Sequence, residues 1–413
     1  MRRFFLLFFA IISPLVAQEE VAAPSQVLSE EDYEMLQQWL EDQRKITIKD
    51  LGGRLSFAGE VRVEAQAFGE VRNGTKQRGF NSATNSPSRA YDVEVNLFID
   101  YRADRTWASI KLEFDNNAGI AGSDGSGTFN RITTERAFFG CRVIEEDTYT
   151  IDLVFGRRRL SYTFDSRVMF NSFMDGIVFK YDHALDRLGD LFFHAGPFIV
   201  NERFDHYAWI WELGLLNVYN TGLYGKYSLI DWNTREFSSD IRQDRFRFLV
   251  SQLSGGYTFR PQPWDKRINV YWAWLINHAA KGVPQTHGRL ENKGWYTGFS
   301  VGEARKKGDW SFDINYQWIR AQAIPSFDVS GIGRGNAQNI GFYGLIENGE
   351  LKSTDKDNAT GETNYRGWTM QLLYLWTNNL TMFQSWSQSV TLDNSIGPNL
   401  RFKMYEVELI YAF

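Results

Sequence analysis

A stretch between positions 156 and 173 carries the side chains of this chain best suited to chemistry. It reads GRRRLSYTFDSRVMFNSF and sets four arginines against a single carboxylate: Arg157, Arg158, Arg159, Arg167 and Asp165. Guanidinium groups that line a narrow, water-filled passage concentrate positive potential and attract anions. If this stretch lined such a passage, its arginines would form a constriction that favours anions.

Residue types used in catalysis and metal binding are scattered by comparison. The histidines show no metal-ligand spacing, and they are His183, His194, His206, His278 and His287. Cys141 is the single cysteine, so no disulfide forms within the chain. His206 beside Asp205 is the nearest approach to a catalytic pair, and such a pair in a loop is more often solvated. The sequence predicts no enzyme, no cofactor and no metal site.

The elements that must position the arginines are β-strands, and the C-terminal one is the clearest. Residues 400–413 read LRFKMYEVELIYAF, in which Tyr405, Val407, Leu409, Tyr411 and Phe413 share one face. Such a strand needs an apolar medium for that face and a neighbouring strand for its edge. The alternative from this stretch alone is a buried terminal strand of a soluble β protein.

The same period of two recurs from position 53 onward. In residues 55–67 and 91–101, apolar residues alternate with polar and charged ones, and the next strand continues the pattern. The residues predicted to face inward are Arg62, Glu64, Asp92, Glu94, Asp100, Lys111 and Glu113. A face so rich in charge suits a water-filled lumen better than a packed core.

Composition supports a membrane-spanning barrel. Aromatic residues make up 16% of the chain, yet after the N-terminus no apolar run reaches the ~18 residues that a membrane helix needs. The formal charge is −5 and there is no basic run, so no nucleic-acid partner is expected. Long polar connections alternate with short turns, and the patterned segments number about sixteen. We predict an all-β fold: a transmembrane antiparallel up-and-down β-barrel over residues 51–413.

These features resemble Gram-negative outer-membrane β-barrels, in particular the porins. In that family the last strand ends in a terminal Phe after alternating aromatics, an assembly signal that Tyr405, Tyr411 and Phe413 match. The third external loop of porins folds into the lumen and sets pore size, which by strand count is the 156–173 stretch. Residues 156–181 also resemble a segment of alginate-export-type barrels. The resemblance implies a trimer in outer-membrane lipid that passes small hydrophilic solutes or ions.

Strand geometry sets a condition on the arginines. Continuing the register from Phe155 places Arg157 and Arg159 on the outer side unless Gly156 breaks the strand. Because guanidinium groups in lipid are costly, we expect the chain to turn inward there. The alternative is that the arginines pair with Asp152, Glu113 or Asp115 on the lumen wall.

The N-terminus carries an export signal and a helix. Arg2 and Arg3 precede an apolar run, and a cleavage site near Ala17 makes residues 1–17 a signal peptide. Residues 18–50 are then a periplasmic linker and an amphipathic helix over 28–46, whose stripe of Tyr33, Leu36 and Leu40 needs a partner surface.

The sequence favours a general diffusion porin in the outer membrane of a Gram-negative bacterium. It leaves open a substrate-specific or anionic-polymer export channel on the same fold. A surface adhesin that displays residues 320–365 and an outer-membrane enzyme are further alternatives.

Overall fold

The computed structural model describes residues 46–48, 54–84, 86–115, 131–201, 206–232, 247–264, 266–283, 286–325, 328–333, 346–347, 350–351, 356–359 and 361–413. The predicted signal peptide and residues 28–45 of the predicted helix lie outside them. Ile46, where that helix was expected to end, lies instead in a short strand, β1 (Ile46–Ile48), beside β2.

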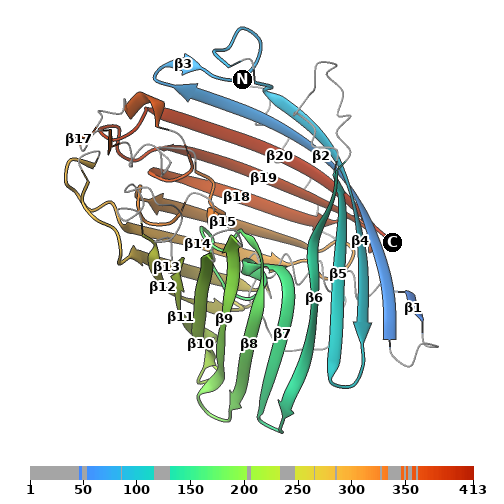
Figure 1. The fold of residues 1–413 in the computed structure, drawn as a ribbon. Helices are drawn as coiled ribbons and strands as arrows, with labels where there is room; N and C mark the ends of the chain where they lie inside the picture. Colours follow the sequence, from blue (N-terminus) through green and yellow to red (C-terminus); the bar gives the residue numbers. More distant parts are fainter. Residues whose placement is uncertain are drawn as a thin grey trace.

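One antiparallel sheet closes on itself into a barrel (Figure 1). The strands that form the barrel wall are β2 (Arg54–Arg72), β4 (Arg89–Arg102), β5 (Thr106–Asp115), β6 (Arg131–Glu145), β7 (Tyr149–Arg159), β8 (Phe173–Leu185), β9 (Gly189–Asn201), β10 (His206–Val218), β11 (Leu223–Asp231), β12 (Leu249–Phe259), β13 (Ile268–Asn277), β14 (Lys293–Glu303), β15 (Trp310–Ile319), β18 (Tyr365–Leu375), β19 (Leu380–Thr391) and β20 (Leu400–Ala412). Each pairs with the next, and β20 pairs with β2 to close the ring. The prediction of a sixteen-stranded barrel is confirmed.

Alternation along each strand separates an apolar outer face from a polar or packed inner face. On β13, Val270, Trp272 and Trp274 are exposed, whereas Tyr271 and Ala273 between them are buried. A closed barrel leaves no unpaired strand edge, so it satisfies its backbone groups without water, as a hydrocarbon environment requires. No helix among the described residues is long and apolar enough to cross a membrane.

The connections differ in length at the two ends of the barrel. At the end where β20 terminates, β4 joins β5 and β6 joins β7 through three residues each. At the opposite end, the connection from β15 to β18 spans residues 320–364 and includes β16 (Ile346–Glu347), β17 (Glu350–Leu351) and the short 3-10 helix η8 (Lys356–Asn358). We call this second end the outer rim.

Two connections from the outer rim fold into the barrel instead of standing above it. One is residues 160–172 between β7 and β8, which begins with the 3-10 helix η2 (Leu160–Tyr162). The other is the first part of the β15–β18 connection, where Ala321, Ala323 and Ile324 are fully buried. The sequence predicted that whole connection to be an external loop, but its start belongs to the interior.

Candidate functional site

The connection of residues 160–172, hereafter the inward loop, is anchored by apolar side chains. Leu160, Phe164 and Phe170 have no exposed surface and join a cluster with inward-facing wall residues, such as Val178 of β8 and Ile210 of β10. Each buried side chain of this size contributes about 1.5–3 kcal/mol to folding. The loop therefore docks against the inner wall and is not free in the lumen.

Asp165 connects the inward loop to three neighbouring strands of that wall, β10, β11 and β12. Its carboxylate accepts a hydrogen bond from Lys226 Nζ of β11 at 2.9 Å. Its own N–H donates to Glu212 of β10 at 3.3 Å, and its carbonyl accepts from Gln252 of β12 at 2.6 Å. The neighbouring Ser166 donates to Gln252 Oε1 at 2.7 Å.

Arg167 extends these ties to β13 and β15. Its guanidinium lies 3.2 Å from Asp313 Oδ2 and 5.0 Å from the centre of the Tyr271 ring. Tyr271 also donates its hydroxyl hydrogen to Asp313, at 2.9–3.0 Å. Gln317 donates to the Arg167 carbonyl at 3.3 Å. Arg167 and Asp165 therefore hold the loop in place, with most of their charge neutralised by partners.

Asp328 fixes the end of the inward loop from the second infolded connection. Its buried carboxylate accepts hydrogen bonds from the Phe170 N–H at 2.9 Å, the Ser172 N–H at 3.1 Å and the Ser172 hydroxyl at 2.8 Å. Burial raises the pKa of Asp328 to about 6, although these hydrogen bonds favour the charged form. Phe170 has a φ of +70°, a conformation that is costly for a bulky residue and is held here by these contacts.

The three consecutive arginines do not stand together in the lumen as predicted. Strand β7 runs through Arg159 with unbroken pairing to β8, so Gly156 does not break the alternation despite its φ of +122°. Arg157 therefore lies on the outer face, where it forms a bidentate ion pair with Asp175. Its Nε and Nη2 atoms each donate to one carboxylate oxygen at 2.9 Å. Arg159 shares that parity and lies 5.1 Å from the centre of the Phe173 ring. The expected inward turn at Gly156 does not occur for Arg157.

Arg158 does point inward, but it is buried and does not border open space. Its side chain is 4% exposed and its guanidinium lies 4.6 Å from the centre of the Phe138 ring. Asp152, the partner considered for these arginines, bonds to Arg142 at 2.9 Å. Asp165 and Arg167 alone of the five predicted constriction residues belong to the inward loop.

The wall formed by β20, β2, β4 and β5 carries the inward-facing charges expected from alternation. Arg62 lies 2.5 Å from Glu60, 3.4 Å from Glu408 and 3.7 Å from Glu94. The structure also places Glu64, Asp92 and Asp100 on inward positions, since Val61, Val63, Val93 and Val95 occupy the alternate ones.

Lys111 is the second cation of this wall. It bonds to Glu135 at 2.5 Å and lies 3.6 Å from Glu113 and 4.0 Å from Glu94. With Glu406 and Glu408 of β20 facing the same interior, the carboxylates around Arg62 and Lys111 outnumber these two cations. We call this surface the acidic wall.

Several residues of the site were missed by sequence reasoning. Glu212 and Asp313 are each the single carboxylate of their strand, and Lys226 is the single lysine or arginine of its strand, a signal that was available. Their pairing with a loop far away in the chain was not, because nothing local specifies it. Asp328 gave no signal at all.

Phe413, which follows β20, extends the pairing of β20 with β2 that closes the barrel. Phe413 exchanges two backbone hydrogen bonds with Gly59 of β2, at 2.8 and 2.9 Å. Its ring covers Gly59, where an added Cβ would lie 2.7 Å from the ring atoms. Tyr405, Tyr411 and Phe413 all lie exposed on the outer face.

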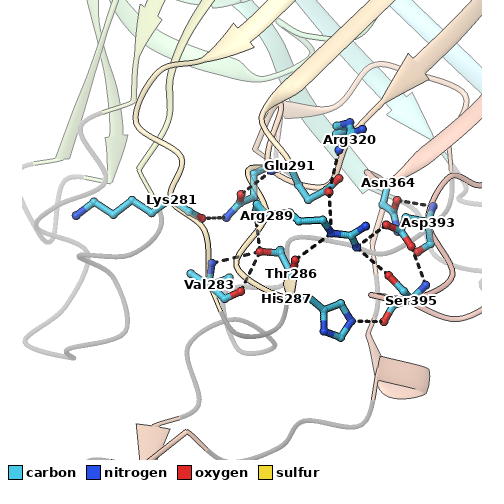
Figure 2. Close-up of polar contacts among 11 residues, drawn as sticks. Lys281, Val283, Thr286, His287, Arg289, Glu291, Arg320, Asn364, Asp393 and Ser395 are labelled. Atoms are coloured by element: carbon cyan, nitrogen blue, oxygen red, sulfur yellow. Dashed lines mark hydrogen bonds and ion pairs between the residues drawn. The ribbon is translucent and has the colours of Figure 1, made fainter.

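A network of polar contacts links three connections at the outer rim (Figure 2). Arg289 bonds to Asp393 at 2.7 Å and to the Ser395 hydroxyl at 2.8 Å, while His287 contacts the Ser395 carbonyl at 3.3 Å. The buried Glu291 bonds to Arg320 at 2.9 Å. These contacts fix the rim above the infolded connections.

The geometry of the site gives little support for metal binding or for catalysis by a histidine. Among the residues that the structure describes, no cluster of three His, Cys, Asp or Glu side chains is arranged to hold a metal ion. His194 lies 3.3 Å from Asp182 Oδ1 and 3.4 Å from the Thr163 carbonyl, so it is part of the wall beneath the inward loop.

Neither a family model nor a curated protein sequence matches the chain. Among solved structures, it is similar to OprB of Pseudomonas putida, with 10% identity and a TM-score of 0.54 over 87% of this chain and 94% of that one. It also aligns with OmpF of Salmonella typhi, with 11% identity and a TM-score of 0.49 over 89% and 100% of the two chains. The likeness to OprB shows that this chain has the fold of the outer-membrane porins.

Proposed function

We propose that this protein is an outer-membrane porin that lets small hydrophilic solutes diffuse through a polar barrel interior. The proposal is supported by the contrast between the two faces of the barrel. The outer face is apolar, whereas the inner face holds the acidic wall and the inward loop. The outer face suits lipid, and the inner face suits water.

The test is conductance of the refolded protein in planar lipid bilayers. We expect stepwise ion currents, and swelling of liposomes in small sugars that stops above a size limit. A folded barrel that inserts without conducting would refute the proposal and favour a surface or structural role.

We further propose that the pore prefers cations, in place of the anion preference predicted from the arginines. Arg157 lies on the outer face and is paired with Asp175, Arg159 lies against the Phe173 ring, Arg158 is buried, and Arg167 is paired with Asp313. The acidic wall then supplies the dominant charge, and low-dielectric surroundings focus its potential. Such a wall repels an anionic polymer, so it also argues against polymer export.

Reversal potentials in a salt gradient test this preference. Replacing Glu60 and Glu408 by Gln should shift the reversal potential towards anions, because two negative charges leave the acidic wall. Arg157→Gln, on the outer face, is the matched control and should leave it unchanged. A shift with Arg157→Gln and none with the glutamates would restore the arginine hypothesis.

A further inference from the structure

Four basic side chains gather on the outer face of the barrel at its outer rim. They are Arg89 of β4, Arg366 of β18, and Arg401 and Lys403 of β20, and together we call them the rim patch. All four are exposed. Their positions share the parity of exposed apolar residues such as Tyr91, so they point away from the lumen.

Strand register brings these side chains together although they span more than three hundred positions of sequence. Arg366 pairs with Val390 of β19, which pairs with Arg401, so the two arginines lie two strands apart. At ~4.8 Å per strand their Cα atoms are separated by about 10 Å. Lys403 follows two residues further along β20, opposite Gly69 of β2.

Arg89 completes the patch on the other side of β2. It pairs with Ala67, and Ala67 pairs in turn with Tyr405 of β20. The residues between the basic side chains are small or apolar: Ala67, Gly69, Val71 and Val390. No bulky charged side chain therefore separates the basic ones on this face.

Each part of the rim patch lies just outside an aromatic residue on the same face of its strand. Arg89 is two residues from Tyr91, Arg366 two from Trp368, and Lys403 two from Tyr405. Exposed tyrosine and tryptophan on a barrel surface mark the boundary between hydrocarbon and headgroups. The cations beyond them therefore stand at the level of the lipid headgroups.

The rim patch also lacks negative charge of its own. None of its four members forms an ion pair or side-chain hydrogen bond with a described residue, and the intervening outward positions hold no carboxylate. Arg157 is the contrast, since it lies on the same outer surface but is neutralised by Asp175. Guanidinium groups at headgroup depth that no described carboxylate neutralises are suited to bind phosphate through charge-assisted hydrogen bonds.

We propose that the rim patch binds the phosphate groups of an anionic, phosphorylated lipid in the outer leaflet. The inference depends on the barrel spanning an outer membrane and not on its conducting solutes. Each cation near an anionic lipid surface strengthens binding, and removing all four should weaken it at least about tenfold.

The experiment uses native mass spectrometry of the refolded full chain with diphosphorylated lipid A as the probe. We expect lipid A to remain bound to the wild type and to be lost when Arg89, Arg366, Arg401 and Lys403 are all replaced by Gln. Lys306→Gln is the control, because Lys306 is an exposed cation in the turn between β14 and β15, at the opposite end of the barrel from the rim patch. Migration of unboiled protein and channel conductance, both unchanged, would show that fold and pore remain.

Three outcomes decide between sources of the ligand. Binding of lipid A, with little competition from inorganic phosphate, supports a lipid site. Equal retention of lipid A by the wild type and the fourfold variant overturns the proposal. Loss of an oligomer in the variant, without any change in lipid A bound per chain, would also overturn it and assign the patch to a subunit contact.

Discussion

Asp328 is a single buried residue on which the end of the inward loop depends. It accepts hydrogen bonds from two backbone N–H groups of the loop, those of Phe170 and Ser172. Its pKa of about 6 lies above the ordinary value of 3.8 because burial outweighs the hydrogen bonds. Within that interval the folded state binds the proton more tightly than the unfolded state, so stability falls as pH rises from about 4 to 6 and then levels off.

We predict that Asp328→Asn removes this slope from the pH dependence of unfolding. An amide also turns an N–H group towards backbone donors, which should lower stability by roughly 1–3 kcal/mol at neutral pH. Urea unfolding in lipid vesicles at several pH values measures both effects. An unchanged slope in the variant would show that Asp328 is not the titrating group.

Gly59 is a second residue whose role follows from one contact. Because the Phe413 ring covers it, a side chain at this position must displace the ring that ends the closing strand. We predict that Gly59→Val reduces the fraction of protein that migrates as a folded barrel without boiling.

Gly69→Val is the control for this substitution. It lies on the same face of β2, where an added Cβ meets only Lys403 Cβ at 4.0 Å. It should fold as the wild type does. Equal folding of both variants would mean that the Phe413 contact does not contribute to closure.

The inward loop is the element that packs inside the barrel and so shapes the space left for solutes. Its apolar side chains supply most of its attachment, and two ion pairs, Asp165–Lys226 and Arg167–Asp313, set its lateral position. Removing one member of such a pair leaves a partly buried charge without its partner.

We predict that Lys226→Met loosens the inward loop and raises the current noise of single channels. The double variant Lys226→Met and Asp165→Asn should restore a steadier current, since neither charge then remains unpaired. Lys306→Met, an exposed lysine in the turn between β14 and β15, should behave as the wild type. A quiet channel in Lys226→Met would show that the apolar contacts alone fix the loop.

For the molecule as a whole, the open question of assembly is tested through the segment before the barrel. A trimer is implied by the resemblance to porins, and the sequence places an apolar stripe of Tyr33, Leu36 and Leu40 before the barrel. We predict that Leu36→Asp weakens a trimer by native mass measurement while the unboiled monomer still migrates as a folded barrel. An unaffected trimer would assign the stripe to tethering or to contact with another protein.

The sequence alone determined the barrel. Alternation of apolar and polar residues is a local property of each strand, so the sixteen strands, their inward faces and the terminal Phe413 could all be predicted from it. The charged positions of the acidic wall followed from the same parity, as Arg62 and Glu64 illustrate.

Only the tertiary structure decided how the interior is arranged. Gly156 could have broken strand β7, and whether it did depended on pairing with β8 and not on glycine itself. The contacts of Arg167 with Asp313 and of Phe170 with Asp328 join residues about 150 positions apart. Such pairings are specified by barrel closure and loop packing, which leave no periodic signal in the sequence. For this reason the sequence predicted a constriction lined by arginines, whereas the structure shows a loop held by paired charges.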